Sequence, residues 1–405
     1  MESKYFIKTC ALIATEGSSL SDDFEISGGN PNITYYESVK SPSISVSIDF
    51  IDVDGVISRE GITGGEYLDL KIKVPDFDDF EITPDKHFMM LNSVKNVKTS
   101  SNKQIATLEF ISVEAIINET ARVSRRFTGN VSQIVKELMK DKKSIQTSKN
   151  LETDESFNKY SFVGNLKRPF DTIQWLCPKA ASTDKECGFL FYENLDGYFF
   201  KSIKGLLESD SSETYEKPEA PVDTDIKITE NNLDSSNDIG MNCRMGMYAN
   251  KTIYVDIENG KLETVDYKIS DLKLAKPPKL PAGLEDAPTR LMLRILDAGA
   301  LQKGSKKEEV EKKSELAVYQ NKSYARTNLL FSQSLSITTP LNPDLRVGQM
   351  IEVKFPIKEN DDQSQTTGGG ENDISGKYLL SELKHSIANG KSNSELKLIR
   401  DVFTA

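Results

Sequence analysis

The stretch LRVGQMIEVKFP, residues Leu345–Pro356, has a counterpart near the start of the chain, LDLKIKVP, residues Leu68–Pro75. When the two prolines are aligned, Val353 falls on Ile72. Apolar and polar residues alternate in both stretches, as they do in a half-buried β-strand, and proline removes the backbone donor where each strand ends. Both stretches are therefore predicted to be strands that stop at proline.

Two further pairs of segments follow in the same order. MLNSVKNV from Met90 aligns without gaps with LLSELKHS from Leu379, and ATLEFI from Ala106 aligns with SELKLI from Ser394. Each set predicts three strands, with a loop before the second strand and a short polar turn before the third. Two interpretations are open. One is a true internal duplication, which we favour, and the other is ordinary antiparallel meanders, which look alike because hairpins impose alternation and polar turns.

Length and charge limit the class of protein. A chain of 405 residues is long enough for about two to four domains. A formal net charge of −11 argues against a protein that grips nucleic-acid phosphates through clustered Lys and Arg, although it is compatible with transient passage of DNA. No apolar run is long enough for a transmembrane helix, and the residues after Met1 lack the apolar core of a secretory signal. We expect the product to accumulate in the cytoplasm.

Changes in hydrophobic period divide the chain into domains. The predicted fold class is mainly β with α+β insertions, and it contains two similar antiparallel β-barrel domains plus a helical, mixed domain. The predicted boundaries are 1–117 for the first β-barrel, 118–222 for the mixed α+β domain, with 257–316 joining it, and 223–256 with 317–405 for the second β-barrel, which carries a mobile insert at 357–376.

The mixed domain contains two predicted helices and a hairpin. The first helix follows Asn130 as its N-cap. The second begins near Pro169, and Pro178 is expected to kink it or to end its regular part. Further on, the dipeptide Asp196-Gly197 is expected to join two aromatic-rich strands into a hairpin.

Two later segments are predicted to lie at the surface. The acidic stretch over residues 208–225 contains prolines and is expected to cross between domains outside the core. The segment over residues 305–328 has helical periodicity with sparse apolar positions and Glu-to-Lys pairs four residues apart. It predicts a solvated helix, with binding of a partner as its alternative role.

The sequence offers little material for catalysis or metal binding. The only two histidines, His87 and His385, each lie on or beside a predicted strand. A nucleophilic pair of Cys177 with His385 has no local signature, so structural roles are favoured for both. The four cysteines lack metal-ligand spacing and are predicted to be free, buried thiols: Cys10, Cys177, Cys187 and Cys243.

Glycine clusters and paired acids also indicate loops. The glycines of Gly61–Gly65 and Gly368–Gly370 lack the Lys-Ser/Thr and the strand-to-helix context of a phosphate-binding loop, so they predict turns. The acid pairs Asp78–Asp79 and Asp361–Asp362 lie in charged segments and predict solvated surface. We therefore expect no catalytic residue, no cofactor and no metal ligand, in a protein that is not an enzyme.

Five segments, in order along the chain, carry a resemblance to a known family. They are GNVSQIVKELMKD (Gly129–Asp141), FVGNLKRPFDTIQWLCPKA (Phe162–Ala180), CGFLFYENLDGYFFKSIKGLL (Cys187–Leu207), LNPDLRVGQMIEVKFP (Leu341–Pro356) and SGKYLLSELKHSI (Ser375–Ile387). Together they resemble the baseplate central-hub protein of T-even-like contractile-tailed bacteriophages. The most specific element is the Pro-Phe-Asp helix with the hairpin that follows it, and the N-terminal third matches in pattern only.

The resemblance implies a structural protein of the virion tail baseplate, assembled in the host cytoplasm. In this family three chains form a ring, and each chain contributes two similar β-barrels around a channel. The implied partners are the central spike or tail lysozyme protein, the tail tube or tube-initiator proteins and neighbouring baseplate wedge proteins. Double-stranded DNA would cross the channel without specific binding, and no membrane insertion is implied. The family also implies that the second barrel starts near Val222 and resumes near Ala317.

The duplication makes a prediction about burial and arrangement. A one-residue change of register would turn every side chain to the other face of its strand. The aligned apolar residues should therefore be buried alike: Leu70, Ile72 and Val74 in the first strand, and Ile351, Val353 and Phe355 in the second. We expect the segments Ser43–Val113 and Asn328–Val402 to fold alike and to stand about 60 degrees apart around a ring.

Three other functions are alternatives. The hub of a bacterial contractile injection or secretion system shares the architecture and is the main alternative, but it commonly carries a β-helical spike in the same chain, and no such repeats occur up to Ala405. A tail-associated peptidoglycan hydrolase requires a recognisable set of acid residues, which we do not find. A host-receptor adhesin would usually show fibre repeats. A structural baseplate hub is therefore the predicted function.

Overall fold

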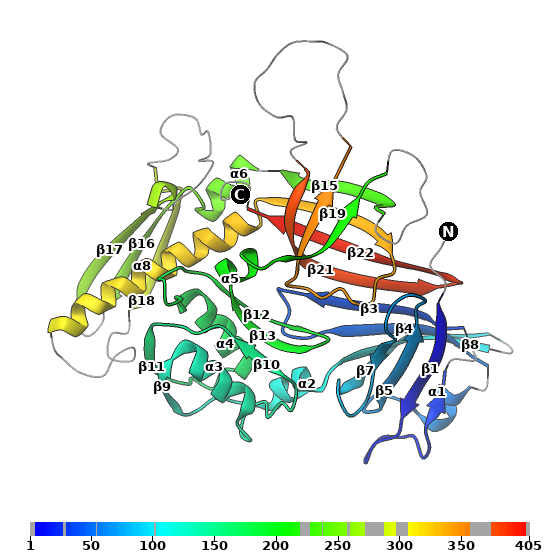
Figure 1. The fold of residues 1–405 in the computed structure, drawn as a ribbon. Coiled ribbons are helices and arrows are strands. Elements are labelled where there is room, and N and C mark those ends of the chain that lie inside the picture. Colours follow the sequence, from blue (N-terminus) through cyan, green and yellow to red (C-terminus); the bar gives the residue numbers. More distant parts are fainter. Residues whose placement is uncertain are drawn as a thin grey trace, which may run out of the picture.

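A computed structural model describes residues 5–26, 30–53, 55–100, 103–218, 227–236, 238–256, 260–271, 287–296, 307–356 and 374–401. Within these ranges the protein is mainly β, and strands from both ends of the chain belong to a single hydrogen-bonded sheet (Figure 1). Helices and smaller sheets lie beside it. The predicted fold class, mainly β with α+β insertions in several domains, is confirmed.

The first β unit contains the N-terminal strands. They are β1 (Phe6–Ile13), β2 (Phe24–Glu25), β3 (Asn32–Ser38), β4 (Ser45–Asp52), β5 (Tyr67–Lys73), β6 (Phe80–Ile82), β7 (Met89–Ser100) and β8 (Lys103–Ser112). Alternate residues point into one apolar core, as the sequence pattern predicts. The short helix α1 (Val56–Glu60) follows β4, and the Asp52 carboxylate accepts hydrogen bonds from its first backbone N–H groups, those of Val56 and Ile57.

The second β unit contains the C-terminal strands and one earlier strand. They are β14 (Ser211–Glu216), β15 (Glu230–Ser236), β19 (Gln333–Pro340), β20 (Met350–Lys354), β21 (Gly376–Ala388) and β22 (Lys391–Arg400). The unit has its own apolar core. We expected residues 208–225 to cross the surface between domains, and this was wrong for β14. That strand pairs in parallel with β20, and Tyr215 on it is buried.

The two units share one order of paired strands. It is β3-β4-β8-β7-β5-β1 in the first and β15-β19-β22-β21-β20-β14 in the second. Both also contain a register shift at the same aligned place: between Leu91 and Ser93 in the β7–β8 ladder, and between Leu380 and Glu382 in the β21–β22 ladder. Hairpin chemistry alone does not require an extra residue at a matching position. The structure therefore favours duplication over two unrelated meanders.

Burial of the aligned strands agrees with the predicted register. Five of the six residues are buried: Leu70, Ile72, Val74, Ile351 and Val353. Phe355 is half-buried against the core of the second unit. The copies differ at their outer strand, because β1 runs antiparallel to β5 whereas β14 runs parallel to β20.

The two units are joined edge to edge. Strand β3 pairs antiparallel with β21, and Tyr35 lies opposite His385 in this ladder. Among the described residues, the path of paired strands runs from β15 to β2 without returning to its start. The two β units thus form one continuous sheet.

A mixed α+β unit lies between the two units in the sequence. It comprises α2 (Val113–Thr120), β9 (Arg126–Asn130), α3 (Val131–Lys140), β10 (Leu151–Thr153), β11 (Lys159–Val163), α4 (Pro169–Leu176), a 3-10 turn η2 (Cys177–Lys179), β12 (Phe189–Asn194), β13 (Gly197–Ser202) and α5 (Ile203–Leu207). Asn130 is the N-cap of α3 as predicted, but its side chain makes no capping bond. Instead the Ser156 hydroxyl accepts from the Ser132 backbone N–H at 2.9 Å.

The predicted ends of the second helix and of the hairpin are close to those observed. Pro169 is the first residue of α4, and Pro178 lies in the 3-10 turn that ends its regular part. The two residues of the hairpin turn are Leu195 and Asp196, because Asn194 pairs with Gly197. The expected Asp-Gly dipeptide therefore straddles the turn and the start of β13.

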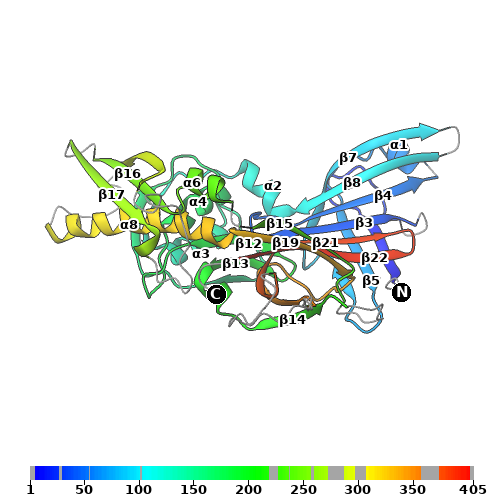
Figure 2. The same ribbon diagram turned by 90° about the horizontal axis from the view of Figure 1, so that it is seen from above.

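A separate three-stranded sheet projects at one end of the molecule, opposite the long strands β7 and β8 (Figure 2). Its strands are β16 (Ala249–Asp256), β17 (Lys261–Lys268) and β18 (Arg290–Leu296), and α6 (Ile239–Met245), the 3-10 turn η3 (Ile269–Asp271) and α8 (Lys307–Leu330) accompany them. We expected residues 249–256 in the second β-barrel, which was wrong. Strand β16 pairs only with β17 and β18 among the described residues, and its Thr252 and Tyr254 hydroxyls bond Asn321 of α8.

Helix α8 differs from the solvated helix predicted from the sequence. Its second half is largely buried, with Tyr319, Asn321 and Leu329 below one tenth exposure. Asn321 accepts from the Thr252 hydroxyl of β16 at 2.8 Å and donates to the Val265 carbonyl of β17 at 3.2 Å. The predicted mobile insert at 357–376 falls mostly on residues 357–373, which lie outside the described residues.

Candidate functional site

The two β units and the mixed unit meet at a buried carboxylate, that of Glu37 on β3. Its oxygens accept hydrogen bonds from the backbone N–H of Leu195 in the mixed unit, at 2.8 Å, and of Val347 in the second β unit, at 3.0 Å. The Tyr35 hydroxyl donates a third bond. Glu37 is 0% exposed, and burial raises its pKa to about 7 although the Arg346 guanidinium favours the charged form.

A second buried carboxylate, that of Glu193 on β12, lies nearby. Lys149 Nζ is 2.7 Å from Glu193 Oε1 and 2.9 Å from Glu114 Oε2. The other oxygen of Glu193 accepts from the Ser112 hydroxyl at 2.6 Å and from the Ile44 backbone N–H at 3.0 Å. Burial by itself would lower the pKa of Lys149. The negative charges of Glu193 and Glu114 have the larger opposite effect, so the pKa of Lys149 is raised above its ordinary value.

We call Glu37, Glu114, Lys149 and Glu193 the junction network. Each carboxylate bonds groups from a different element or unit, so its geometry is met only when the units are correctly placed. A buried charge destabilises the folded protein when one of its partners is missing. When all its partners are present, its hydrogen bonds hold them in one geometry. The network therefore fixes how the mixed unit sits against the two β units.

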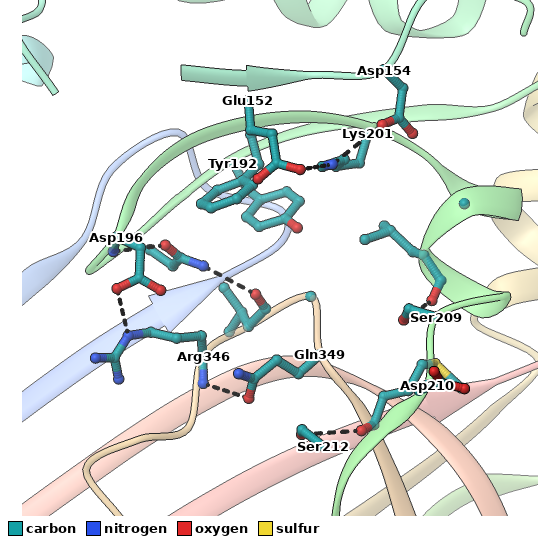
Figure 3. A pocket seen from close by; sticks show the side chains of 17 residues that line it. Glu152, Asp154, Tyr192, Asp196, Lys201, Ser209, Asp210, Ser212, Arg346 and Gln349 are labelled. Atoms are coloured by element: carbon teal, nitrogen blue, oxygen red, sulfur yellow. Dashed lines mark hydrogen bonds and ion pairs between the residues drawn. The ribbon is translucent and has the colours of Figure 1, made fainter. Parts of the chain in front are cut away.

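A cleft of about 370 Å³ opens next to this junction (Figure 3). Strands β12 and β13, α5 and the loop before β20 line it. On one wall Lys201 pairs with Glu152 and with Asp154, and on another Arg346 Nε lies 3.4 Å from Asp196 Oδ1. The side chains described around the cleft include no histidine and no cysteine. The described walls of the cleft thus carry two sets of charge pairs.

The cleft also contains a close contact between units. Gly348, in the loop before β20, has φ +90°, and a Cβ atom there would lie 2.1 Å from the Tyr192 hydroxyl of β12. Tyr192 in turn stacks on Phe199 with ring centroids 5.4 Å apart. Only glycine allows the loop to approach the hairpin this closely.

The structure places Cys177 and His385 in different units. Cys177 is buried in the core of the mixed unit, and burial raises the pKa of its thiol to about 12. His385 lies on β21, stacked on Tyr35, with Nδ1 2.9 Å from the Ser394 hydroxyl. Burial, aided by the positive charge of Arg346, lowers the pKa of His385 to about 3. The two residues do not form a nucleophile and base pair.

The other residues considered from the sequence have local contacts. The Nδ1 atom of His87 accepts from the Thr83 backbone N–H at 3.0 Å. Asp79 forms an ion pair with Lys8 at 2.6 Å, and Gly61 ends α1 in the left-handed conformation. All four cysteines are free, and three are buried as predicted, but Cys243 is only partly buried. The acid pair at 361–362 and the three glycines at 368–370 lie outside the described residues.

No group of three or more His, Cys, Asp or Glu side chains among the described residues is arranged to hold a metal ion. No helix in the described part of the chain combines the length and apolar character that crossing a membrane requires.

The projecting sheet exposes aliphatic side chains on the face away from α8. On β18, Leu291, Leu293 and Ile295 are 68–73% exposed, while the intervening Arg294 lies over the Tyr324 ring of α8. Leu262 of β17 is also exposed. Grouped aliphatic residues on an open sheet face are typical of a surface that contacts another protein.

Comparison with known proteins gives structural matches only. No protein-family model matches the sequence, and no curated protein matches it. The tail protein from Neisseria meningitidis MC58 matches with a TM-score of 0.54 at 10% identity, over 99% of this chain and 98% of that one. The chain has a tail-protein fold. The 43 kDa tail protein of prophage MuSo2 from Shewanella oneidensis matches with a TM-score of 0.50 at 9% identity, over 98% and 99%.

These matches confirm the predicted resemblance to tail proteins at the level of the fold. The junction network, in contrast, was missed from the sequence. Its signal was present, because Glu37 and Glu193 each stand in a run of strand-forming residues, ITYYESV and FLFYENL. An acid at such a position indicates a buried charge with a partner elsewhere, but nothing local identifies Lys149 as that partner.

Proposed function

We propose that the chain is the structural hub of a contractile phage-tail baseplate. In this role it forms a homotrimeric, pseudo-sixfold ring that joins a trimeric central spike to a hexameric tail tube and leaves a channel for DNA. Its place is the tail baseplate of the virion, after assembly in the host cytoplasm. The observation that carries the proposal is one chain with two β units of the same strand order, joined side by side in one sheet.

The duplicated β unit allows a trimer to bind partners of two different symmetries, one threefold and one sixfold. A ring of three chains that each carry two alike units presents six similar surfaces to one side. The mixed unit and the projecting sheet occur once per chain and therefore repeat threefold. A threefold spike and a sixfold tube can then each find a matching set of contacts.

The role needs binding surfaces and no chemistry. The partners are the spike or tail lysozyme protein, tube or tube-initiator proteins and baseplate wedge proteins, and the exposed aliphatic face of β18 offers an area for such contact. The net charge of −11 favours passage of DNA without adhesion, because like charges repel. The junction network and the charge-paired cleft serve rigidity in this proposal.

Electron microscopy and light scattering of the purified protein test the proposal. We expect a trimer that appears as a ring with a central opening, with three peripheral projections. A strict monomer at high concentration, even with a spike protein present, would contradict it. A monomer seen only in the absence of the spike would not, because ring and spike can assemble together.

The absence of catalysis has its own test. The purified chain is expected to leave peptidoglycan suspensions turbid and peptide substrates intact. Clearing that copurifies with this polypeptide and persists in Cys177→Ala would show an enzyme that the proposal does not allow.

A further inference from the structure

The cleft between the β12–β13 hairpin and the loop before β20 has more negative groups than positive ones. Its described lining includes four carboxylates and two cations, which leaves an excess of two negative charges. The carboxylates are Glu152, Asp154, Asp196 and Asp210, and the cations are Lys201 and Arg346. The cleft therefore has the charge to attract a cation.

Both cations of the lining already have partners. Lys201 lies between the two carboxylates of its own wall, Glu152 and Asp154. Arg346 Nε lies 3.4 Å from Asp196 Oδ1, and Arg346 Nη1 donates to two backbone carbonyls of its own loop, at 2.6 and 2.7 Å. The remaining carboxylate, that of Asp210, is exposed and forms no ion pair with a described residue.

Tyr192 distinguishes this cleft from an ordinary acidic patch on the surface. The residue is only 2% exposed, yet its hydroxyl has no hydrogen-bond partner among the described residues. Figure 3 shows this hydroxyl pointing into the cleft. A buried hydroxyl without a hydrogen bond is unfavourable, so such a group indicates a missing partner.

The lining also defines the chemistry of that partner. An anion would be repelled, and a neutral molecule would leave the two negative charges in place. Burial raises the pKa of Tyr192 well above its ordinary value, so the hydroxyl is neutral and can accept an N–H group. Leu206 and Met350 are buried apolar walls, and Phe199 is a half-buried one. An alkyl chain fits such walls, and an ammonium group offers three donors and no acceptor.

We propose that this cleft binds an alkyl ammonium group, with the Tyr192 hydroxyl and the Asp210 carboxylate as acceptors of its N–H groups. The alkyl chain then packs against Phe199 and Leu206. A free polyamine and the lysine side chain of a partner protein share this chemistry. The inference goes beyond the hub role and does not depend on it.

A simpler explanation is a solvated acidic surface on which a water molecule bonds Tyr192. Water would satisfy the hydroxyl but would leave the excess negative charge in place. The two explanations differ in whether the cleft binds amines at a single site.

Calorimetric titration of the full-length protein with cadaverine and with spermidine tests the proposal. We expect binding at one site, and affinity that falls as sodium chloride is added, because salt screens the attraction. Pentanediol has the same chain as cadaverine without the charges and should not bind. Glutarate, which has carboxylates in place of the amines, should not bind either.

Two variants locate the site. Asp210→Asn and Tyr192→Phe should each weaken binding by roughly threefold or more. Tyr192→Phe keeps the ring that stacks on Phe199, so thermal unfolding should show that this variant is folded. The matched control, Glu230→Gln, removes one negative charge from an exposed position on β15 outside the cleft and should leave binding unchanged.

A third probe, Nα-acetyl-lysine methylamide, separates the two sources of the ammonium. Binding as tight as that of cadaverine assigns the cleft to a partner's lysine, whereas binding of spermidine alone assigns it to a free polyamine. The proposal is overturned if no amine binds up to about 20 mM. It is also overturned if Asp210→Asn and Tyr192→Phe bind amines as the wild type does. A protein that forms the expected ring but binds no amine would refute this inference and leave the hub role standing.

Discussion

Glu37 accepts backbone hydrogen bonds from two other units, so its ionisation is linked to the stability of the junction. Its pKa is raised from 4.5 to about 7 in the folded protein. Between these values the folded state holds a proton that the unfolded state has lost. The contribution of this group to stability is therefore greatest below about pH 4.5 and is lost as the pH rises to about 7.

Glu37→Gln removes this titration. The free energy of unfolding of the wild type minus that of the variant should fall by roughly 3 kcal/mol between pH 4.5 and pH 7 and then stay level. Urea unfolding at a series of pH values measures it. A difference that is independent of pH would mean that Glu37 is ionised throughout.

Lys149 neutralises two buried carboxylates at once. Lys149→Met should lower the free energy of unfolding by about 3–5 kcal/mol, because Glu114 and Glu193 are then left as buried charges without their cation. Adding Glu193→Gln to Lys149→Met should recover part of the loss. Lys143→Met, an exposed change in the same unit, is the control and should have little effect. If the two lysine changes lowered the free energy of unfolding equally, the junction network would not contribute to stability as described.

At the scale of elements, the duplicated strands β5 and β20 should respond alike to the same change. Ile72→Asp and Val353→Asp each place an unpaired charge in a fully buried position and should cost several kcal/mol, roughly 3 or more. Lys73→Asp lies next to Ile72 on β5 but is exposed, and should cost little. Urea unfolding and limited proteolysis report the loss. Tolerance of one buried aspartate and not the other would show that the two copies are packed differently.

The elements predicted correctly from the sequence are those in which apolar residues recur at a regular spacing. The repeat strands, α3 and α4 were found because burial on one side leaves a period of two or of 3.6 residues. Strand β14 was missed, because it is short, acidic and parallel to its partner, and has Tyr215 as its buried residue. The burial of α8 was missed because polar groups such as Asn321 mediate part of its contact, which no apolar stripe reveals.

At the scale of the whole molecule, the acidic chain is expected to let DNA pass. Double-stranded DNA should not be retained by the purified protein in a band-shift assay at physiological salt, because a net charge of −11 per chain opposes release of counterions by Lys and Arg. A basic DNA-binding protein of similar size serves as the positive control. Retention that weakens steeply with added salt would reveal a basic surface that the proposed channel should lack.

The arrangement of units could be predicted only in part. Two alike β units followed from the repeat, but their edge-to-edge joint through β3 and β21 did not, because no local pattern specifies which strand edge meets which. The same holds for the junction network, where Glu37 meets Leu195 and Val347 from distant parts of the chain. Both depend on contacts that form only in three dimensions.

The β3–β21 joint also sets an order of events during synthesis. The hydroxyl of Tyr36 on β3 donates to Glu382 on β21 across 346 residues of sequence. At ordinary rates of translation β3 leaves the ribosome roughly 20–70 s before its neighbour exists. During this interval the β21-facing edge of β3 in the nascent first unit is unpaired. Chains released early by premature termination should therefore be prone to aggregate. Chaperones that shield strand edges should matter most for such incomplete chains.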